Sequence, residues 1–353
     1  MTNYSPLARK KILHIISGDL WAGAEAQTHS LLQHLKLQCA VSAVLMNEGE
    51  LANRLRACDI PVTILDETKL TTWKIFQRLR THMRLLKPDV VHTHRQKENI
   101  LGALANATTV KAFCVRTVHG APEGKSHFKI DIQRHLERWV TTKLQDRVIA
   151  VSDELKEKLS TDYPINMIDV IYNGVDIEEL NARARIADFK LEQPHKKHIG
   201  IIGRLVKVKR IDLFLATAAL FKEDANPGYH FHVIGEGPLR QHLETMAKHM
   251  AIDEIVTFHG QRHDIPSCIL SLDAVVMCSD HEGMPMVALE SAALNTIFIT
   301  HLAHLEKITN QPPIQKSPQD FAQAIRHQPS KAASPPKASS CSSQTFELYS
   351  RNI

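Results

Sequence analysis

The sequence of 353 residues lacks most of the patterns that mark a secreted, zinc-stapled or membrane-spanning protein. Its six cysteines are scattered and include no C-x-x-C pair, which argues against a disulfide framework or a zinc ribbon. No uninterrupted apolar run approaches the roughly 20 residues of a membrane-spanning helix. Residues 1–11 are polar and basic, without the apolar segment of a secretory signal. We therefore expect a cytoplasmic protein of a reducing compartment.

Several catalytic and binding signatures are also missing. Aromatic residues make up only 5% of the chain and the basic residues are dispersed, which disfavours nucleic acid as a partner. The sequence holds no D-x-D pair for a metal–diphosphate complex, no G-x-S-x-G and no H-E-x-x-H. Residues 120–126 resemble a P-loop, but three residues separate the glycines instead of four. That spacing leaves the phosphate cradle one amide short.

What is present is a globular composition, with 43% hydrophobic and 23% charged residues and enough length for two domains. The charge is unevenly distributed. Residues 1–150 hold 22 Lys and Arg against 13 Asp and Glu, whereas residues 151–353 hold 21 against 25. A basic first half favours a domain that meets something anionic, although an ordinary solvated surface explains the numbers equally well.

Short β-branched runs alternate with amphipathic segments, and the alternation starts again after residue 172. The expected strands are residues 11–17, 40–46, 62–65, 90–93, 113–119, 147–152, 198–203, 229–234, 256–259, 273–278 and 296–300. This pattern predicts an α/β protein with two doubly wound, Rossmann-like domains, 1–172 and 173–327, facing a central cleft. Residues 311–343 break the pattern, and residues 328–353 are predicted to be a flexible tail rich in Ser and Pro.

The richest local pattern is Ser279-Asp280-His281-Glu282-Gly283-Met284-Pro285-Met286-Val287-Ala288-Leu289-Glu290, directly after an expected strand. Glu282 precedes the helix that Pro285 favours, and Glu290 lies about a turn and a half inside it. The amides near Met286 and Val287 form a natural seat for phosphate, and two flanking carboxylates suit the hydroxyls of a nucleotide sugar. An ordinary helix start explains the same residues.

Three further patterns lie where strands are expected to end. Gly203-Arg204-Leu205-Val206-Lys207-Val208-Lys209-Arg210 carries four cations, of which Arg204 and Lys209 suit a diphosphate, unless the loop is simply solvated. Gly23 allows a backbone amide to approach a ligand at a helix start, or belongs to a plain turn. The histidines at expected strand ends are His92, His94 and His119; a lone histidine is usually structural.

The order of these motifs is more informative than any one of them. In chain order the motifs are Gly23-Ala24-Glu25, Val91-His92-Thr93-His94, Val118-His119-Gly120, Tyr172-Asn173-Gly174, Gly203-Arg204 with Lys209, Gly235-Glu236-Gly237-Pro238-Leu239, Phe258-His259-Gly260 and Glu282 to Glu290. From about residue 11 to 306 this succession resembles the retaining GT-B glycosyltransferases of family 4 (glycosyl transferases group 1).

The resemblance implies a metal-independent transferase that moves a sugar from a UDP- or GDP-type donor to a glycan or lipid-linked acceptor, as in lipopolysaccharide, capsule or other surface polysaccharide synthesis. It implies no further cofactor. By position, Glu282 faces the donor sugar and Glu290 the ribose, while Arg204 and Lys209 bind the diphosphate. Gly23 lies beside the phosphate, Met286 and Val287 begin the nucleotide-binding helix, and His119 meets the transferring sugar.

The sequence departs from the family after Glu290, because residues 301–306 contain no glycine where the family has a Gly-Gly loop. A catalytically weakened or silent nucleotide-sugar-binding or scaffold protein is therefore an alternative, and a sugar-nucleotide 2-epimerase is a third hypothesis. Residues 73–87 form a basic amphipathic segment that suits the anionic inner face of a membrane, or a solvated helix packed by its apolar side.

Overall fold

The computed structural model describes residues 10–19, 21–120, 128–186, 189, 191–222, 228–309 and 312–328. The chain divides into two compact units between Gly174 and Val175, where the sequence predicts a boundary between residues 172 and 173. The predicted tail, 328–353, lies outside the described residues except for Gln328.

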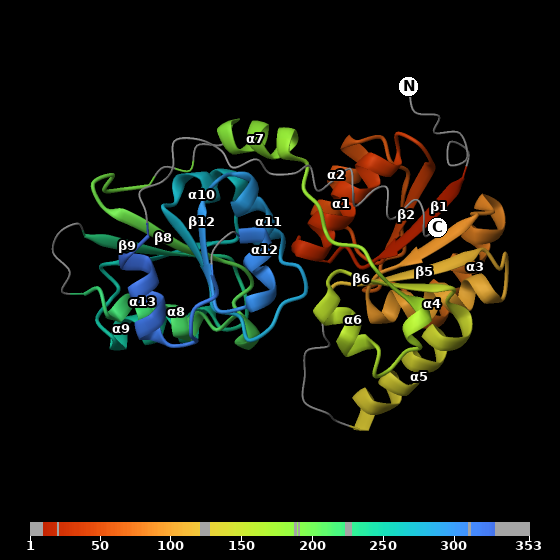
Figure 1. Cartoon of the computed structure of the whole chain (residues 1–353). Helices are drawn as coiled ribbons and strands as arrows, with labels where there is room; N and C mark the ends of the chain where they lie inside the picture. The colour runs from red at the N-terminus through yellow and green to blue at the C-terminus, as the bar shows by residue number, and fades with distance from the viewer. Residues whose placement is uncertain are drawn as a thin grey trace. The chain divides into compact units, whose positions relative to one another are not determined.

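The described part of the first unit is a parallel sheet covered by helices on both faces (Figure 1). Its strands lie in the order β3-β2-β1-β4-β5-β6-β7. They are β1 (Lys11–Ile16), β2 (Ala40–Leu45), β3 (Val62–Ile64), β4 (Val90–Thr93), β5 (Phe113–Val118), β6 (Arg147–Ala150) and β7 (Ile168–Val170). The helices are α1 (Gly23–Leu35), α2 (Glu50–Ala57), α3 (Thr72–Leu86), α4 (Gln96–Ala107), α5 (Phe128–Leu144) and α6 (Asp153–Leu159).

The sheet of the first unit is buried on both faces, which is why its strands read as continuous apolar runs. Side chains alternate along β1, so Ile12 and Ile16 pack with α1 and α2, whereas Leu13 and Ile15 pack with α3 and α4. The crossovers run to both sides of β1, so the carboxyl ends of β1 and β4, where the order reverses, lie side by side. The doubly wound arrangement predicted for this domain is confirmed.

The second unit repeats the architecture with the order β10-β9-β8-β11-β12, all parallel. Its strands are β8 (Lys197–Ile202), β9 (Tyr229–Ile234), β10 (Val256–Gly260), β11 (Ala274–Met277) and β12 (Ile297–Thr300). The helices are α7 (Ile177–Ile186), α8 (Ile211–Ala219), α9 (Arg240–His249), α10 (Ile265–Ser271), α11 (Met286–Ala293), α12 (Glu306–Thr309) and α13 (Pro318–Arg326). The switch point lies between β8 and β11, and it brings residues 203–210 and 279–282 to one sheet edge.

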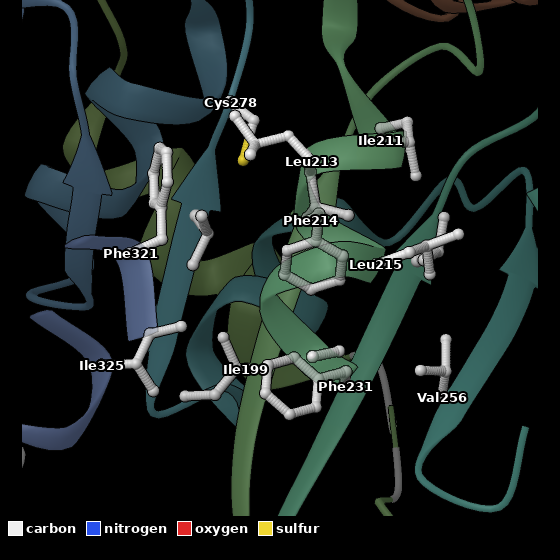
Figure 2. Packing of buried hydrophobic residues seen from close by; sticks show 14 of the residues in the cluster. Ile199, Ile211, Leu213, Phe214, Leu215, Phe231, Val256, Cys278, Phe321 and Ile325 are labelled. Carbon is white, nitrogen blue, oxygen red and sulfur yellow. The ribbon is translucent and has the colours of Figure 1, made fainter. Parts of the chain in front are cut away.

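Helix α13 corrects the expectation that the regular pattern ends at residue 311. Phe321 and Ile325 of this helix are fully buried and join Phe214 and Phe231 in one apolar cluster (Figure 2). Pro318 stands in the first turn, where its missing N–H is not needed, and Ser317 caps the helix by accepting a hydrogen bond from the amide of Asp320 at 3.2 Å. Pro318 therefore marks a helix start within the segment that the sequence predicts to be irregular.

In the described ranges, no helix combines the length and the apolar character that a bilayer crossing requires.

Candidate functional site

The loop after β8 is tied to the segment after β11 by three contacts at the switch point of the second unit. The amide of Asp280 donates to the carbonyl of Val208 at 2.8 Å, and Arg210 donates to the Asp280 carboxylate at 3.3 Å. Lys209 Nζ donates to Glu282 Oε1 at 2.5 Å. Basic residues 203–210 and the acidic segment around Glu282 thus form one structure, although more than 70 positions separate them.

The Lys209–Glu282 ion pair is largely shielded from water, with side-chain exposures of 20% and 14%. Shielding strengthens the attraction between the charges and also raises the cost of leaving one of them unpaired. Beside Lys209 lies a small hollow of about 10 Å³, room for one water molecule, lined by Gly203, Lys209, Ser279 and Val287 and by apolar strand residues. The hollow is too small for a phosphate, but a cation beside a helix start suits a phosphate group that binds at the surface.

Asp280 carries the second set of ionic contacts at this edge. Its carboxylate accepts hydrogen bonds from Arg210 and from Lys316. Burial opposes ionisation, but these two cations outweigh it and lower the pKa of Asp280. The ionised Asp280 therefore anchors the loop through Arg210, which has left-handed backbone geometry (φ 51°) at the start of α8.

Helix α11 begins at Met286, four residues after Glu282, and Pro285 before it has extended geometry. Met286 is buried, while Val287 lines the hollow. Glu290 lies one turn inside the helix and is partly buried. Burial raises the pKa of Glu290 to about 7, against the opposing charge of Arg183. Its carboxylate is therefore poorly solvated and gains from any hydroxyl that donates to it.

Close backbone contacts between glycines hold the loop after β8 in place. The Gly203 amide donates to the Ile234 carbonyl at 3.0 Å, and the Gly235 amide donates to the Gly260 carbonyl at 2.8 Å. Gly235 has a φ of 142°, and a Cβ there would lie 1.9 Å from the Gly203 carbonyl oxygen. Only glycine satisfies both the backbone angle and the space at this position.

We expect Gly235→Ala to destabilise the protein by about 2–4 kcal/mol, because the new methyl group meets backbone and cannot rotate away. Gly228→Ala is the matched control: its Cβ would meet only the flexible end of Lys196, at 3.3 Å, so its effect should stay within about 0.5 kcal/mol. Urea unfolding followed by circular dichroism measures both. Equal stabilities of the two variants would show that the glycine contact does not hold the loop.

In the first unit, the predicted residues Gly23 and His119 follow β1 and β5, the two strands that flank β4 in the sheet. Gly23 is the first residue of α1, and His119 directly follows β5. Between them Arg95, after β4, donates to Glu25 at 2.6 Å and to Asp19 at 3.0 Å. Burial raises the pKa of Glu25 to about 7, and Arg95 opposes this shift.

Three histidines from three strands connect into one hydrogen-bonded series, which we call the His14–His94–His119 chain. His14 Nδ1 lies 3.2 Å from His94 Nε2, and His94 Nδ1 lies 3.0 Å from His119 Nε2. Burial lowers the pKa of His14 to about 3; burial, with the charges of Arg95 and Arg116, lowers that of His119 to about 4. All three rings are therefore neutral at physiological pH.

The structure thus groups the predicted residues by unit. One edge of the second sheet carries Lys209, Glu282, Met286, Val287 and Glu290. Arg204 lies exposed on the loop that holds Lys209. Arg95 and the contact between Asp280 and Arg210 are site features that the sequence does not predict. Arg95 could have been predicted from its place directly after the strand end Val91-His92-Thr93-His94. The contact between Asp280 and Arg210 could not, because nothing in the spacing of these residues along the sequence indicates it.

Two family comparisons match most of the chain in succession. Residues 21–179 match the family described as Glycosyltransferase Family 4, and residues 182–304 match Glycosyl transferases group 1. The chain belongs to the group 1 and family 4 glycosyltransferases. The resemblance drawn from motif order is confirmed.

This glycosyltransferase is similar to two bacterial enzymes of known reaction. It is 27% identical over 304 residues to the Escherichia coli UDP-Gal:alpha-D-GlcNAc-diphosphoundecaprenol alpha-1,3-galactosyltransferase, covering 80% of this chain and 76% of that enzyme. It is 24% identical over 291 residues, with the same shares, to a Campylobacter jejuni alpha-1,4-N-acetyl-D-galactosaminyltransferase named for an undecaprenol-linked diphosphate acceptor. Anabaena HepE, solved in complex with UDP-glucose, aligns with a TM-score of 0.74 at 18% identity over 97% of this chain and 95% of that one. The GT-B fold of this glycosyltransferase is thereby confirmed.

Proposed function

We propose that this glycosyltransferase moves a sugar, with retention of anomeric configuration, from a UDP- or GDP-sugar to a glycan or lipid-linked acceptor of surface polysaccharide synthesis such as lipopolysaccharide or capsule. The observation that carries the proposal is the Lys209–Glu282 ion pair, whose carboxylate stands four residues before the start of α11. It provides a cation for a diphosphate and a carboxylate for a sugar hydroxyl at one place. The two enzymes compared above use lipid-linked diphosphate acceptors by name.

In the proposed reaction the bond between the anomeric carbon and the donor phosphate breaks while a bond to the acceptor oxygen forms on the same face. The proton of the acceptor hydroxyl passes to the departing phosphate oxygen. Lys209, with Arg204 and the amides of Met286 and Val287, would stabilise the negative charge that develops on the diphosphate. Glu282 would hold the sugar, Glu290 the ribose, and Gly23 and His119 the phosphate and sugar from the first unit. This charge stabilisation is supplied by the chain itself, so we propose a metal-independent mechanism.

A second candidate function is supported by the segment that follows β12. His304 Nε2 lies 3.2 Å from the carbonyl oxygen of Gly283, next to Glu282, and Leu305 is fully buried. His304 therefore puts a bulky side chain next to the Glu282 segment, while Leu305 packs in the apolar core of the second unit. Such a bulky side chain at this position favours a protein that binds nucleotide sugars without turning them over.

One experiment separates these functions. The full-length protein is incubated with UDP- and GDP-sugars radiolabelled in the sugar and with undecaprenyl-diphosphate-linked glycans. Label in the glycan supports the transferase. Saturable donor binding without product supports the silent binding protein, and recovery of an isomerised donor supports the 2-epimerase. No binding of any donor contradicts all three.

We further propose that the enzyme works as a peripheral protein at the inner face of the membrane and docks through α3. This helix has no acidic residue, and its exposed side carries Arg78 and Arg84. Trp73 and Leu85, which are 65% and 81% exposed, supply apolar contact beside the cations. Such a mixture suits anionic lipid headgroups.

The docking proposal predicts co-sedimentation with vesicles that contain phosphatidylglycerol, weakened by salt and absent for phosphatidylcholine alone. The double variant Arg78→Gln/Arg84→Gln should lose about 2 kcal/mol of binding, since each cation near an anionic surface contributes about 1 kcal/mol. Arg185→Gln/Lys248→Gln removes the same charge from exposed positions in the second unit and is the control. Binding that ignores salt and lipid charge would contradict this docking.

A further inference from the structure

The His14–His94–His119 chain ends on atoms that have no hydrogen-bond partner among the described residues. His14 Nε2 and His119 Nδ1 are both buried and unpartnered. The rings of His94 and His119 are stacked, with centroids 5.3 Å apart and planes at 15°. The chain therefore begins in the core at β1 and ends at the carboxyl end of β5.

Neutral imidazoles constrain one another in such a chain. Each ring has one N–H donor and one acceptor nitrogen, so both hydrogen bonds must run in the same direction. Only two arrangements exist. In one, His14 donates to His94 and His94 donates to His119, which leaves an N–H at Nδ1 of His119. In the other, the direction is reversed and an N–H is left at Nε2 of His14.

The places of the two end residues in the fold decide between the arrangements. Both terminal nitrogens are buried, but His14 is 0% exposed within β1, whereas His119 is a partly exposed residue at a strand end, where a bound ligand can approach its ring. An N–H without a partner costs more than an acceptor without one, and it costs most where no ligand or water can reach it. The arrangement with the free N–H on His119 avoids an orphaned donor in the core.

We propose that His14 and His94 are positioning residues that hold His119 in its Nδ1–H tautomer, so that His119 presents a hydrogen-bond donor to an oxygen of the bound ligand. That this ligand is the sugar of a nucleotide sugar rests on the proposed function. The tautomer itself does not, because it follows from the chain alone.

A metal centre is the competing interpretation of the same histidines. Ligating atoms of His14, His92 and His94 lie within 4.8 Å of one another. However, His92 Nε2 lies 2.8 Å from Thr117 Oγ1, and its ring is stacked on that of His94 with centroids 4.4 Å apart. One nitrogen of His92 is thus engaged with Thr117, and burial, with the nearby charge of Arg95, disfavours a further positive charge at His94. These contacts favour the hydrogen-bonded chain.

The second unit contains a comparable series whose direction is set by its partner atoms. His198 Nε2 lies 3.2 Å from the carbonyl oxygen of Gln193, which only accepts, so His198 must donate there. His198 Nδ1 then accepts from His232 Nε2 at 2.9 Å, and His232 Nδ1 accepts from His259 Nε2 at 2.8 Å. This series is an internal standard for a tautomer measurement.

The test is nuclear magnetic resonance of the full-length protein labelled with ¹⁵N in its histidines, recorded first with a chelator and then with added zinc. In the wild type we expect His119 to carry its proton on Nδ1. His94→Phe removes the donor and should move that proton to Nε2. His94→Asn, whose amide nitrogen sits near the position of Nδ1, should restore the wild-type pattern, and His232→Phe should leave it unchanged.

Three results would overturn the proposal. They are an Nε2–H tautomer of His119 in the wild type, a pattern that ignores His94→Phe, and a zinc-dependent shift of the His14, His92 and His94 nitrogens, which would reveal a metal centre. The measurement uses no sugar donor. A protein that fails to transfer sugar while keeping the tautomer would contradict the proposed function and leave this inference standing.

Discussion

Lys209→Met is expected to reduce sugar transfer by about 10²–10³-fold while the protein stays folded. The side chain keeps its length but loses the charge that would face the diphosphate, so the developing negative charge is left to Arg204 and the helix amides. Initial rates with a radiolabelled donor measure the effect. Where the donor sugar is still unknown, loss of the UDP- or GDP-induced rise in melting temperature serves instead.

Two further variants sharpen the Lys209 experiment. Lys207→Met removes the same charge from an exposed position on the same loop and should keep the wild-type rate. Lys209→Met strands the partly buried Glu282, so adding Glu282→Gln should recover stability without recovering transfer. Equal rates for the Lys209 and Lys207 variants would remove Lys209 from the site.

Glu290→Gln is expected to make the stability of the protein less dependent on pH. The folded state holds the Glu290 proton up to about pH 7, whereas the unfolded chain releases it near 4.5. The folded state therefore binds more protons between these values, and its stability falls as the pH rises through this window. Glu290→Gln has no titrating carboxyl at this position, so the stability of the variant does not fall across this window. It should match the wild type near pH 5 and exceed it by about 2–3 kcal/mol near pH 8.

Melting temperatures across this pH range, with and without UDP, test both the shift and the proposed ribose contact. A ribose hydroxyl that donates to Glu290 favours the carboxylate, so the UDP-induced stabilisation should grow with pH in the wild type and stay constant in Glu290→Gln. Glu254→Gln, an exposed position in the same unit, is the control. Parallel pH curves for wild type and Glu290→Gln would contradict the burial of this carboxylate.

The strands were predictable because a parallel sheet covered on both faces needs short β-branched runs, and these stand out between polar turns. Helix α13 was missed since it lies between Pro312-Pro313 and the stretch rich in Ser and Pro that begins at Pro329, so the whole segment looks like a break. Proline occurs both at helix starts and where helices are interrupted, so its presence alone does not distinguish the two. The burial of Phe321 and Ile325 shows that a packed helix follows Pro318.

The site was predictable as a set of residue types but not as a set of contacts. Motif order identifies Lys209 and Glu282, yet nothing in their spacing indicates that they form an ion pair with each other. The same holds for His119, whose partners His94 and His14 come from two other strands. Side-chain contacts between distant strand ends depend on register and topology, which a single sequence does not encode locally.

If Lys209 binds the donor diphosphate as proposed, its ion pair with Glu282 has a consequence for the end of each catalytic cycle. A nucleoside diphosphate that occupies Lys209 must compete with a carboxylate that is already within reach of the ammonium group. When the spent nucleotide leaves, Glu282 can replace it at once, so departure never exposes a bare cation in a shielded pocket. Such an exchange of anions lowers the affinity for the product and favours rapid clearance of the enzyme for the next donor.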